Sequence, residues 1–179
     1  FSWSPNSTDI AYTTLNEPKN KAEIEKGFTA FEIANNDMFV VSQPQPAHIW
    51  LVNTTTAVSK RLTDGDWSLP VVIPPGPPPA PFSWSADGKT ILFLKVISPY
   101  SGDGRNRTIQ VLNIADGTYK PLTTRKILEN APDFSPYASK ISYWYKKDNM
   151  GSNINELWVA DTNAGEGKAI ATQLDIDFS

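Results

Sequence analysis

The stretch FSWSADGKTILF, residues 82–93, joins an aromatic start to an apolar end through a short polar segment. Asp87 and Gly88 favour a tight turn, and the β-branched and aromatic residues that follow favour a strand. The stretch therefore predicts a β-hairpin. Residues 1–12 and 132–143 repeat the pattern. All three copies share a spacing of 7 positions, from Trp3 to Ile10, from Trp84 to Ile91 and from Phe134 to Ile141.

A second hairpin follows in each copy, at residues 48–62, 108–122 and 156–170. Its turn contains glycine in two copies, as at Asp116-Gly117, and glycine readily adopts positive φ. The copies align without a gap, since 12 positions separate Trp50 from Leu62, Gln110 from Leu122 and Trp158 from Ile170. The joints between hairpins vary in length. Fixed hairpins with variable joints indicate a repeat protein built from four-stranded units.

We therefore predict an all-β protein, namely a β-propeller with about three four-stranded antiparallel blades, which is a partial propeller. The blade-like repeats cover approximately residues 1–70, 82–124 and 132–173 of one domain, 1–179. Residues 70–81 form a proline-rich joint, which we interpret as an extended strap between blades. Because closed propellers have about 4–8 blades, three blades predict either a partly open array or a head-to-tail homodimer with a six-bladed ring.

The composition excludes several classes of function. Lys and Arg number 16 against 19 Asp and Glu, so the net charge of −3 offers no broad cationic surface for nucleic acid. The lack of Cys and the single histidine exclude thiolate and multi-histidine metal sites. No apolar run reaches the roughly 18 residues of a membrane-spanning helix. We expect no metal, no cofactor, no nucleic acid and no membrane span.

Large aromatic residues recur at matching positions of the hairpins. They are Trp3, Trp84 and Phe134 in the first hairpins, and Trp50 and Trp158 in the second. We interpret this recurrence as packing of each blade against its neighbour, not as a set of ligand-stacking rings.

The joints of variable length all lie at one end of the strands, because the strands of a blade run antiparallel. Loops on a rigid scaffold commonly carry recognition, and aromatic or arginine side chains in loops can anchor a partner. We therefore predict four contact residues in the joints: Trp67, Tyr100, Arg105 and Arg107. A plain solvated loop is the alternative for each of them.

Two stretches carry a resemblance to known families. Residues 82–93 resemble the WSPDG-x-x-IAF repeat of TolB-type (WD40-like, PD40) β-propellers, and residues 158–161 resemble a later part of that repeat. Residues 31–37, 46–52 and 61–63 resemble an early blade in the N-terminal propeller of prolyl-oligopeptidase-family (S9) serine peptidases. In that family the propeller covers an α/β-hydrolase domain and filters access to its catalytic triad. The resemblance thus implies an accessory role in peptide hydrolysis.

The chain itself is not expected to be an enzyme, because it has no Gly-x-Ser-x-Gly nucleophile elbow. We interpret His48, between apolar strand residues, as a strand-edge residue and not as a catalytic base. Some dipeptidyl members of the family bind a substrate amine with paired glutamates. Glu23 and Glu25 are not adjacent here, and a solvated face of a short helix explains them better.

Two functions remain open. The preferred one is a non-catalytic propeller portion of an S9-type peptidase, similar to dipeptidyl or acylaminoacyl peptidases, which gates or positions a peptide substrate. Its partner would be an α/β-hydrolase catalytic domain, and the intact protein would be a serine peptidase. The alternative is a TolB-type propeller for protein–protein interaction with no attached enzyme. A third class, oligogalacturonate lyase, needs a metal and several histidines and is excluded.

Overall fold

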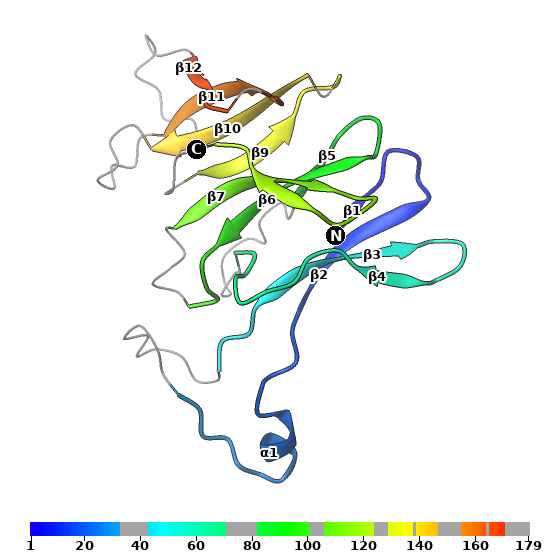
Figure 1. The fold of residues 1–179 in the computed structure, drawn as a ribbon, viewed down its shortest axis with the longest axis vertical. Helices are drawn as coiled ribbons and strands as arrows, with labels where there is room; N and C mark the ends of the chain where they lie inside the picture. Colours follow the sequence, from blue (N-terminus) through cyan, green and yellow to red (C-terminus); the bar gives the residue numbers. More distant parts are fainter. Residues whose placement is uncertain are drawn as a thin grey trace.

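The strands form three four-stranded antiparallel sheets, which are the blades of a partial β-propeller (Figure 1). The computed structural model describes residues 1–32, 43–70, 82–100, 106–123, 129–137, 139–146, 155–163 and 165–170. Blade 1 contains β1 (Ser2–Trp3), β2 (Asp9–Leu15), β3 (Ala47–Asn53) and β4 (Ser59–Arg61). Blade 2 contains β5 (Phe82–Trp84), β6 (Thr90–Val96), β7 (Arg107–Asn113) and β8 (Tyr119–Pro121). Blade 3 contains β9 (Asn130–Phe134), β10 (Lys140–Lys146), β11 (Asn155–Asp161) and β12 (Lys168–Ile170).

The strand register confirms both predicted hairpins in every blade. The residues that lie 7 positions apart in the first hairpins are direct cross-strand partners: Trp3 with Ile10, Trp84 with Ile91, and Phe134 with Ile141. The second hairpins pair β3 with β4, β7 with β8 and β11 with β12. Each sheet keeps its strands in chain order, so the all-β propeller prediction is confirmed.

Two apolar cores hold the blades together, one on each face of blade 2. Strand β6 contributes to both, because its side chains alternate between the faces. Ile91 and Phe93 pack toward blade 1, and Leu92 and Leu94 pack toward blade 3, all of them buried. Blade 2 is therefore covered on both sides, which explains why residues 91–94 of β6 form a continuous apolar run instead of an alternating one.

The prediction that the repeated aromatic residues pack between blades is confirmed for three of the five. Trp84 packs on the core between blades 1 and 2, and Phe134 and Trp158 pack on the core between blades 2 and 3. The prediction is wrong for the two in blade 1. Trp3 is 52% exposed, and Trp50 stacks on Tyr12 within its own sheet. These residues occupy the face of blade 1 that no other described blade covers.

The turn between the third and fourth strands places one residue in the left-handed region in each blade. Ala57 (φ 55°), Gly117 (φ 73°) and Gly165 (φ 43°) occupy the same repeat position. In blades 1 and 2 the amide of this residue donates to the carbonyl of Asn53 and Asn113, respectively, at 2.9 Å. The glycines suit this conformation, as the sequence predicts, but blade 1 adopts it with an alanine at an energetic cost.

Replacing Ala57 with glycine is expected to stabilise the chain by about 0.5–1 kcal/mol, because it relieves the left-handed strain. Ala115, an exposed turn residue of blade 2 whose φ is not positive, is the matched control. Ala115→Gly should lower the unfolding free energy, since glycine only adds freedom to the unfolded chain. Urea denaturation of both variants measures the effects, and an equal change in both would contradict the expectation.

The long connection between β2 and β3 contains a five-residue helix, α1 (Lys21–Glu25), which extends away from the blades in Figure 1. All its residues are exposed, including Glu23 and Glu25. This confirms the solvated short helix expected for them. No helix among the described residues is long and apolar enough to cross a membrane.

The tight turns and the joints occupy opposite ends of the strands, as an antiparallel arrangement requires. The turns include residues 85–89 and 114–118, and the described joints include residues 16–32 and 62–70. Arg105 and all of the proline-rich joint except Pro70 lie outside the described residues, so their predicted roles stay predictions.

Candidate functional site

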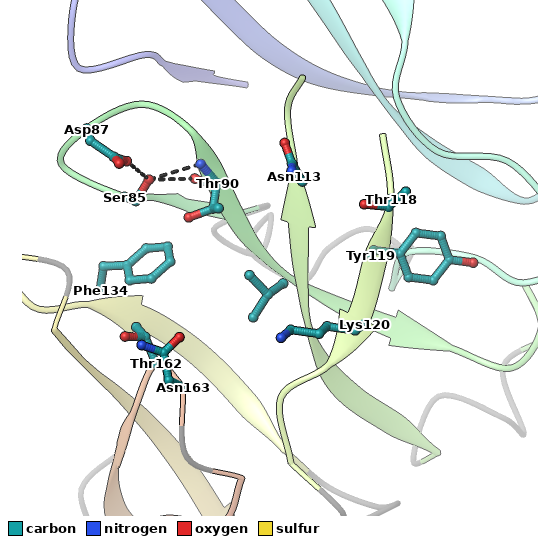
Figure 2. Close-up of a pocket in the computed structure, with 11 residues that line it drawn as sticks. Ser85, Asp87, Thr90, Asn113, Thr118, Tyr119, Lys120, Phe134, Thr162 and Asn163 are labelled. Carbon is teal, nitrogen blue, oxygen red and sulfur yellow. Dashed lines mark hydrogen bonds between the residues drawn. The ribbon is translucent and has the colours of Figure 1, made fainter. Parts of the chain in front are cut away.

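A groove of about 560 Å³ lies between blades 2 and 3, at the end of the strands that carries the tight turns. Its walls come from the Ser85–Thr90 turn, the end of β7 and the start of β8 in blade 2, and from Phe134, Thr162 and Asn163 of blade 3 (Figure 2). Val111 and Phe134 supply apolar surface and also pack on the core between these blades. Hydroxyl, amide and charged side chains supply the rest. A volume of this size suits a small ligand or a short peptide segment.

Hydrogen bonds hold the turn at one side of the groove together. The Ser85 hydroxyl donates to Asp87 Oδ1 at 2.7 Å and accepts from the Thr90 amide at 3.0 Å. The amide of Lys89 donates to the same carboxylate oxygen at 3.1 Å. The hydrogen bond from Ser85 and then that from Lys89 lower the pKa of Asp87, so this carboxylate is a fixed negative group.

The opposite side of the groove carries a cation. Lys120, on β8, has no hydrogen-bond or ion-pair partner among the described residues, and its ammonium group points into the space before Thr162 and Asn163 in Figure 2. Asn163 is exposed and its side-chain amide also makes no hydrogen bond to a described residue. The groove therefore presents unused hydrogen-bond donors on the side opposite Asp87.

The structure places Trp67 in the core and not in a solvated loop, so its predicted exposure is wrong. Its ring is 7% exposed and stacks on Phe93, with centroids 5.6 Å apart. It also meets the edges of His48 at 4.7 Å and of Tyr119 at 5.4 Å. A partner would meet little of this ring, because both blades cover it.

The other predicted contact residues lie at the end of the strands away from the groove. Tyr100 belongs to the joint between β6 and β7, Arg107 is the first residue of β7, and both are half-buried. Arg107 approaches Asn130 Oδ1 at 3.5 Å, and burial lowers its pKa. Neither residue lines the groove, and a role in binding is a proposal for both.

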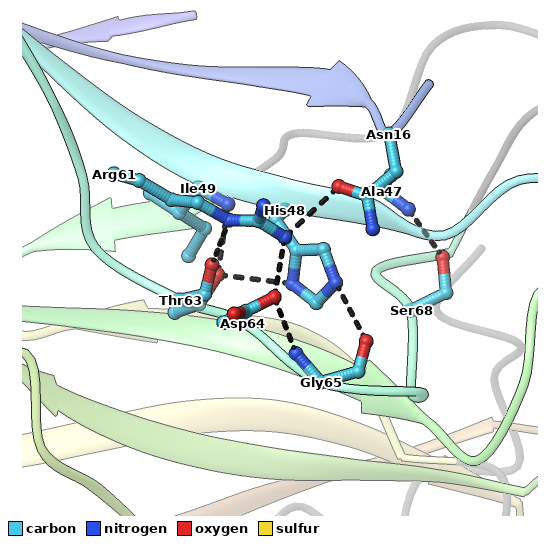
Figure 3. Close-up of polar contacts among 9 residues, drawn as sticks. All are labelled: Asn16, Ala47, His48, Ile49, Arg61, Thr63, Asp64, Gly65 and Ser68. Carbon is cyan, nitrogen blue, oxygen red and sulfur yellow. Dashed lines mark hydrogen bonds and ion pairs between the residues drawn. The ribbon is translucent and has the colours of Figure 1, made fainter. Parts of the chain in front are cut away.

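His48 lies in β3, an inner strand of blade 1, and is fully buried, so the strand-edge interpretation is wrong. Figure 3 shows the reason, which is that the chain after β4 folds back over the imidazole. His48 Nε2 lies 3.1 Å from the Gly65 carbonyl, and Nδ1 lies 3.3 Å from the Thr63 hydroxyl. The Thr63 hydroxyl oxygen in turn accepts a hydrogen bond from the Ile49 amide at 2.9 Å.

These contacts define the tautomer of His48. A carbonyl oxygen can only accept, so Nε2 carries the proton and donates to Gly65. Nδ1 is then the acceptor for the Thr63 hydroxyl. Burial, and next the charge of Arg61, lower the pKa of His48 from its ordinary value of 6.5, outweighing Asp64 and the Gly65 hydrogen bond. The imidazole is thus a neutral structural group with both nitrogens engaged.

Acidification below the ordinary histidine pKa of 6.5 is expected to weaken the fold. Because the folded-state pKa is lowered, the unfolded chain binds a proton there that the folded chain does not. The stability is present above 6.5 and is lost as the pH falls from there toward the folded-state pKa. Urea denaturation at about pH 7.5 and about pH 5.5 measures the change. In His48→Gln this part of the pH dependence should disappear, and an unchanged pH slope would contradict the assignment.

The groove itself was not predicted from the sequence, which placed binding at the joints. The signal that could have found it is a departure from the repeat. Ile114 and Ala115 in blade 2 align with Thr162 and Asn163 in blade 3, so polar residues replace apolar ones at a position where two blades meet.

Comparison with solved structures identifies the fold. A protein described as TolB from Agrobacterium tumefaciens superimposes with a TM-score of 0.57 at 16% identity, over 93% of this chain and 46% of that chain. A protein described as dipeptidyl aminopeptidase IV from Bacteroides ovatus gives 0.55 at 19% identity, over 91% and 22%. An oligogalacturonate lyase in complex with manganese gives 0.51 at 8% identity, over 68% and 34%. No protein-family model and no curated protein matches the sequence.

The chain is therefore a section of a β-propeller, with a ligand-sized groove between two of its blades. It spans less than half the length of each of these three structures. Its propeller has a TolB-like fold, and the structure described as dipeptidyl aminopeptidase IV shares this fold. The three similar proteins differ in function, so the shared fold does not determine what this chain does.

Proposed function

We propose that this chain is the non-catalytic propeller section of an S9-type serine peptidase, in which it gates or positions a peptide substrate. The observation that carries the proposal is the state of His48, the single histidine of the sequence. A triad histidine must hand a proton between a serine and a leaving group, whereas both nitrogens of His48 are bonded inside blade 1. A hydrolytic centre would have to come from another domain, as in the peptidases that the sequence resembles.

The coding region around these residues tests the proposal. It should encode an α/β-hydrolase domain with a Gly-x-Ser-x-Gly elbow followed by Asp and His in chain order. The intact protein should then react with a fluorophosphonate probe, and replacing the elbow serine with alanine should abolish the reaction. An intact protein of propeller blades alone would overturn the peptidase role.

That second outcome would favour a TolB-type propeller for protein–protein interaction. Its support is the similarity to TolB over 93% of this chain, which is as extensive as the similarity to the peptidase. Rigid blades whose joints differ in length are suited to recognition in either case. Tyr100, Arg105 and Arg107 are the proposed contacts at the joint end, with Trp67 limited by its burial.

The proposal includes a partner for the open face of blade 1. Trp3 is 52% exposed there, although the matching Trp84 and Phe134 pack against the preceding blade. A second copy, placed head to tail, could cover this face with its third blade. Light scattering should then give a mass near twice 19.8 kDa, and Trp3→Asp should reduce it to the monomer. A wild-type monomer would overturn the homodimer.

A further inference from the structure

The two interfaces between blades can be compared position by position, because the blades are repeats. Ile114 and Thr162 occupy the same place, just after the third strand of blades 2 and 3. Both residues make the same kind of backbone hydrogen bond. The Ile114 amide donates to Lys89 O at 3.0 Å, and the Thr162 amide donates to Ser139 O at 3.3 Å. The two interfaces therefore differ in side chains and not in the path of the chain.

The interface between blades 1 and 2 is closed at this place. The Ile114 side chain packs on the core between the blades. Lys60, on β4, reaches across and donates to the Ala115 carbonyl at 3.4 Å. An apolar side chain thus fills the space, and a lysine of the preceding blade bonds to the turn behind it.

The interface between blades 2 and 3 has the same elements in an open form. Thr162 and Asn163 replace Ile114 and Ala115, and the groove of about 560 Å³ lies beside them. Lys120 is the counterpart of Lys60, but its ammonium group reaches no acceptor among the described residues. A cation that is bonded in one interface is left available in the next, over the apolar surface of Val111 and Phe134.

We propose that this groove binds an extended peptide through a carboxylate held by Lys120, with the amide of Asn163 as a second donor. A neighbouring apolar side chain of the peptide would rest on Val111 and Phe134. Asp87, on the other side, already has its charge fixed by hydrogen bonds from Ser85 and Lys89. It would accept peptide amides and repel a second carboxylate, which sets the direction of the peptide. The inference rests on the proposed peptide-handling role for its class of ligand.

Calorimetric titration of the chain with three tetrapeptides tests the inference. The probe is Ala-Leu-Asp-Ala with both ends blocked, its neutral partner has Asn in place of Asp, and a third peptide carries its only carboxylate at the C-terminus. The chain should prefer the probe over its neutral partner by about tenfold, as a charge-assisted hydrogen bond allows. The third peptide tells whether a side-chain or a terminal carboxylate is the better ligand.

Two variants locate the site, and one is a matched control. Lys120→Ala should abolish the preference for the acidic peptides, whereas Lys60→Ala, at the same position of blade 1, should keep it. Thr162→Ile copies Ile114, so it should fill the groove and weaken binding of the probe about tenfold or more. The midpoint of thermal unfolding should not fall in Thr162→Ile, which separates a closed groove from a damaged fold.

Equal effects of Lys120→Ala and Lys60→Ala, full binding by Thr162→Ile, or no saturable binding of any peptide would each overturn the inference. These results are independent of the fluorophosphonate test on the intact protein. If the chain binds the probe as described but the intact protein lacks a reactive serine, the peptidase role is refuted and the proposed binding by the groove stands. If the intact protein has a reactive serine but the groove binds no peptide, the peptidase role stands and the proposed binding by the groove is refuted.

Discussion

Trp67→Ala is expected to destabilise the chain by about 3–5 kcal/mol, the usual range for removing a buried aromatic side chain. The Trp67 ring links blades 1 and 2, because it stacks on Phe93 of blade 2 and contacts His48 of blade 1 edge to face. The ammonium of Lys95 lies 5.1 Å from the ring centroid and would lose this cation–π contact. Since small domains are stable by only about 5–15 kcal/mol, the midpoint of urea unfolding should fall sharply.

Two other variants show whether the effect comes from burial. Trp67→Phe should retain part of the aromatic packing, and it removes no hydrogen bond to a described residue, because Trp67 Nε1 has no partner among them. Tyr137→Ala removes an aromatic ring from a residue that is 91% exposed, so its effect should stay below about 1 kcal/mol. A similar loss in Tyr137→Ala and Trp67→Ala would contradict the linking role of Trp67.

The blade architecture could be predicted from the sequence because it depends on short-range spacing. A tight turn fixes which residues of two strands face each other, so the constant 7-position spacing is enough to pair Trp84 with Ile91. The alternation along β6 could not be recognised in the same way, since both faces of that strand are buried and residues 91–94 are all apolar.

The sites were harder to predict because they depend on contacts between distant segments. Trp67 follows Asp64, Gly65 and Asp66, which read as a solvated turn. The ring is buried because Ser68 pairs with Val96 of blade 2, with backbone hydrogen bonds of 3.1 and 2.8 Å. Gly65 permits this, since a Cβ there would lie 2.8 Å from the ring. Local composition does not reveal such a long-range pairing.

Glu129 is another residue whose role only the structure reveals. It precedes β9 and is fully buried, an unusual place for a carboxylate. The Ile109 amide donates to Oε2 at 2.7 Å, and the Thr123 hydroxyl donates to Oε1. In blade 1 the matching amide, that of Ile49, is satisfied directly by Thr63 at 2.9 Å. Blade 2 inserts a carboxylate between the same two groups and so ties the start of blade 3 to β7.

Glu129→Ala is therefore expected to lower the unfolding free energy by about 3–5 kcal/mol, because two buried donors lose their acceptor and a cavity remains. Glu129→Gln should cost less, since its amide oxygen can accept from Ile109 while its NH₂ donates to the Thr123 hydroxyl. Glu17→Ala removes an exposed carboxylate paired with Lys21, and its effect should stay within about 0.5 kcal/mol. Urea denaturation of the three variants decides the matter. If Glu129→Ala unfolds at the wild-type midpoint, Thr123 must reach the Ile109 amide directly, as Thr63 reaches Ile49, and the carboxylate would be dispensable.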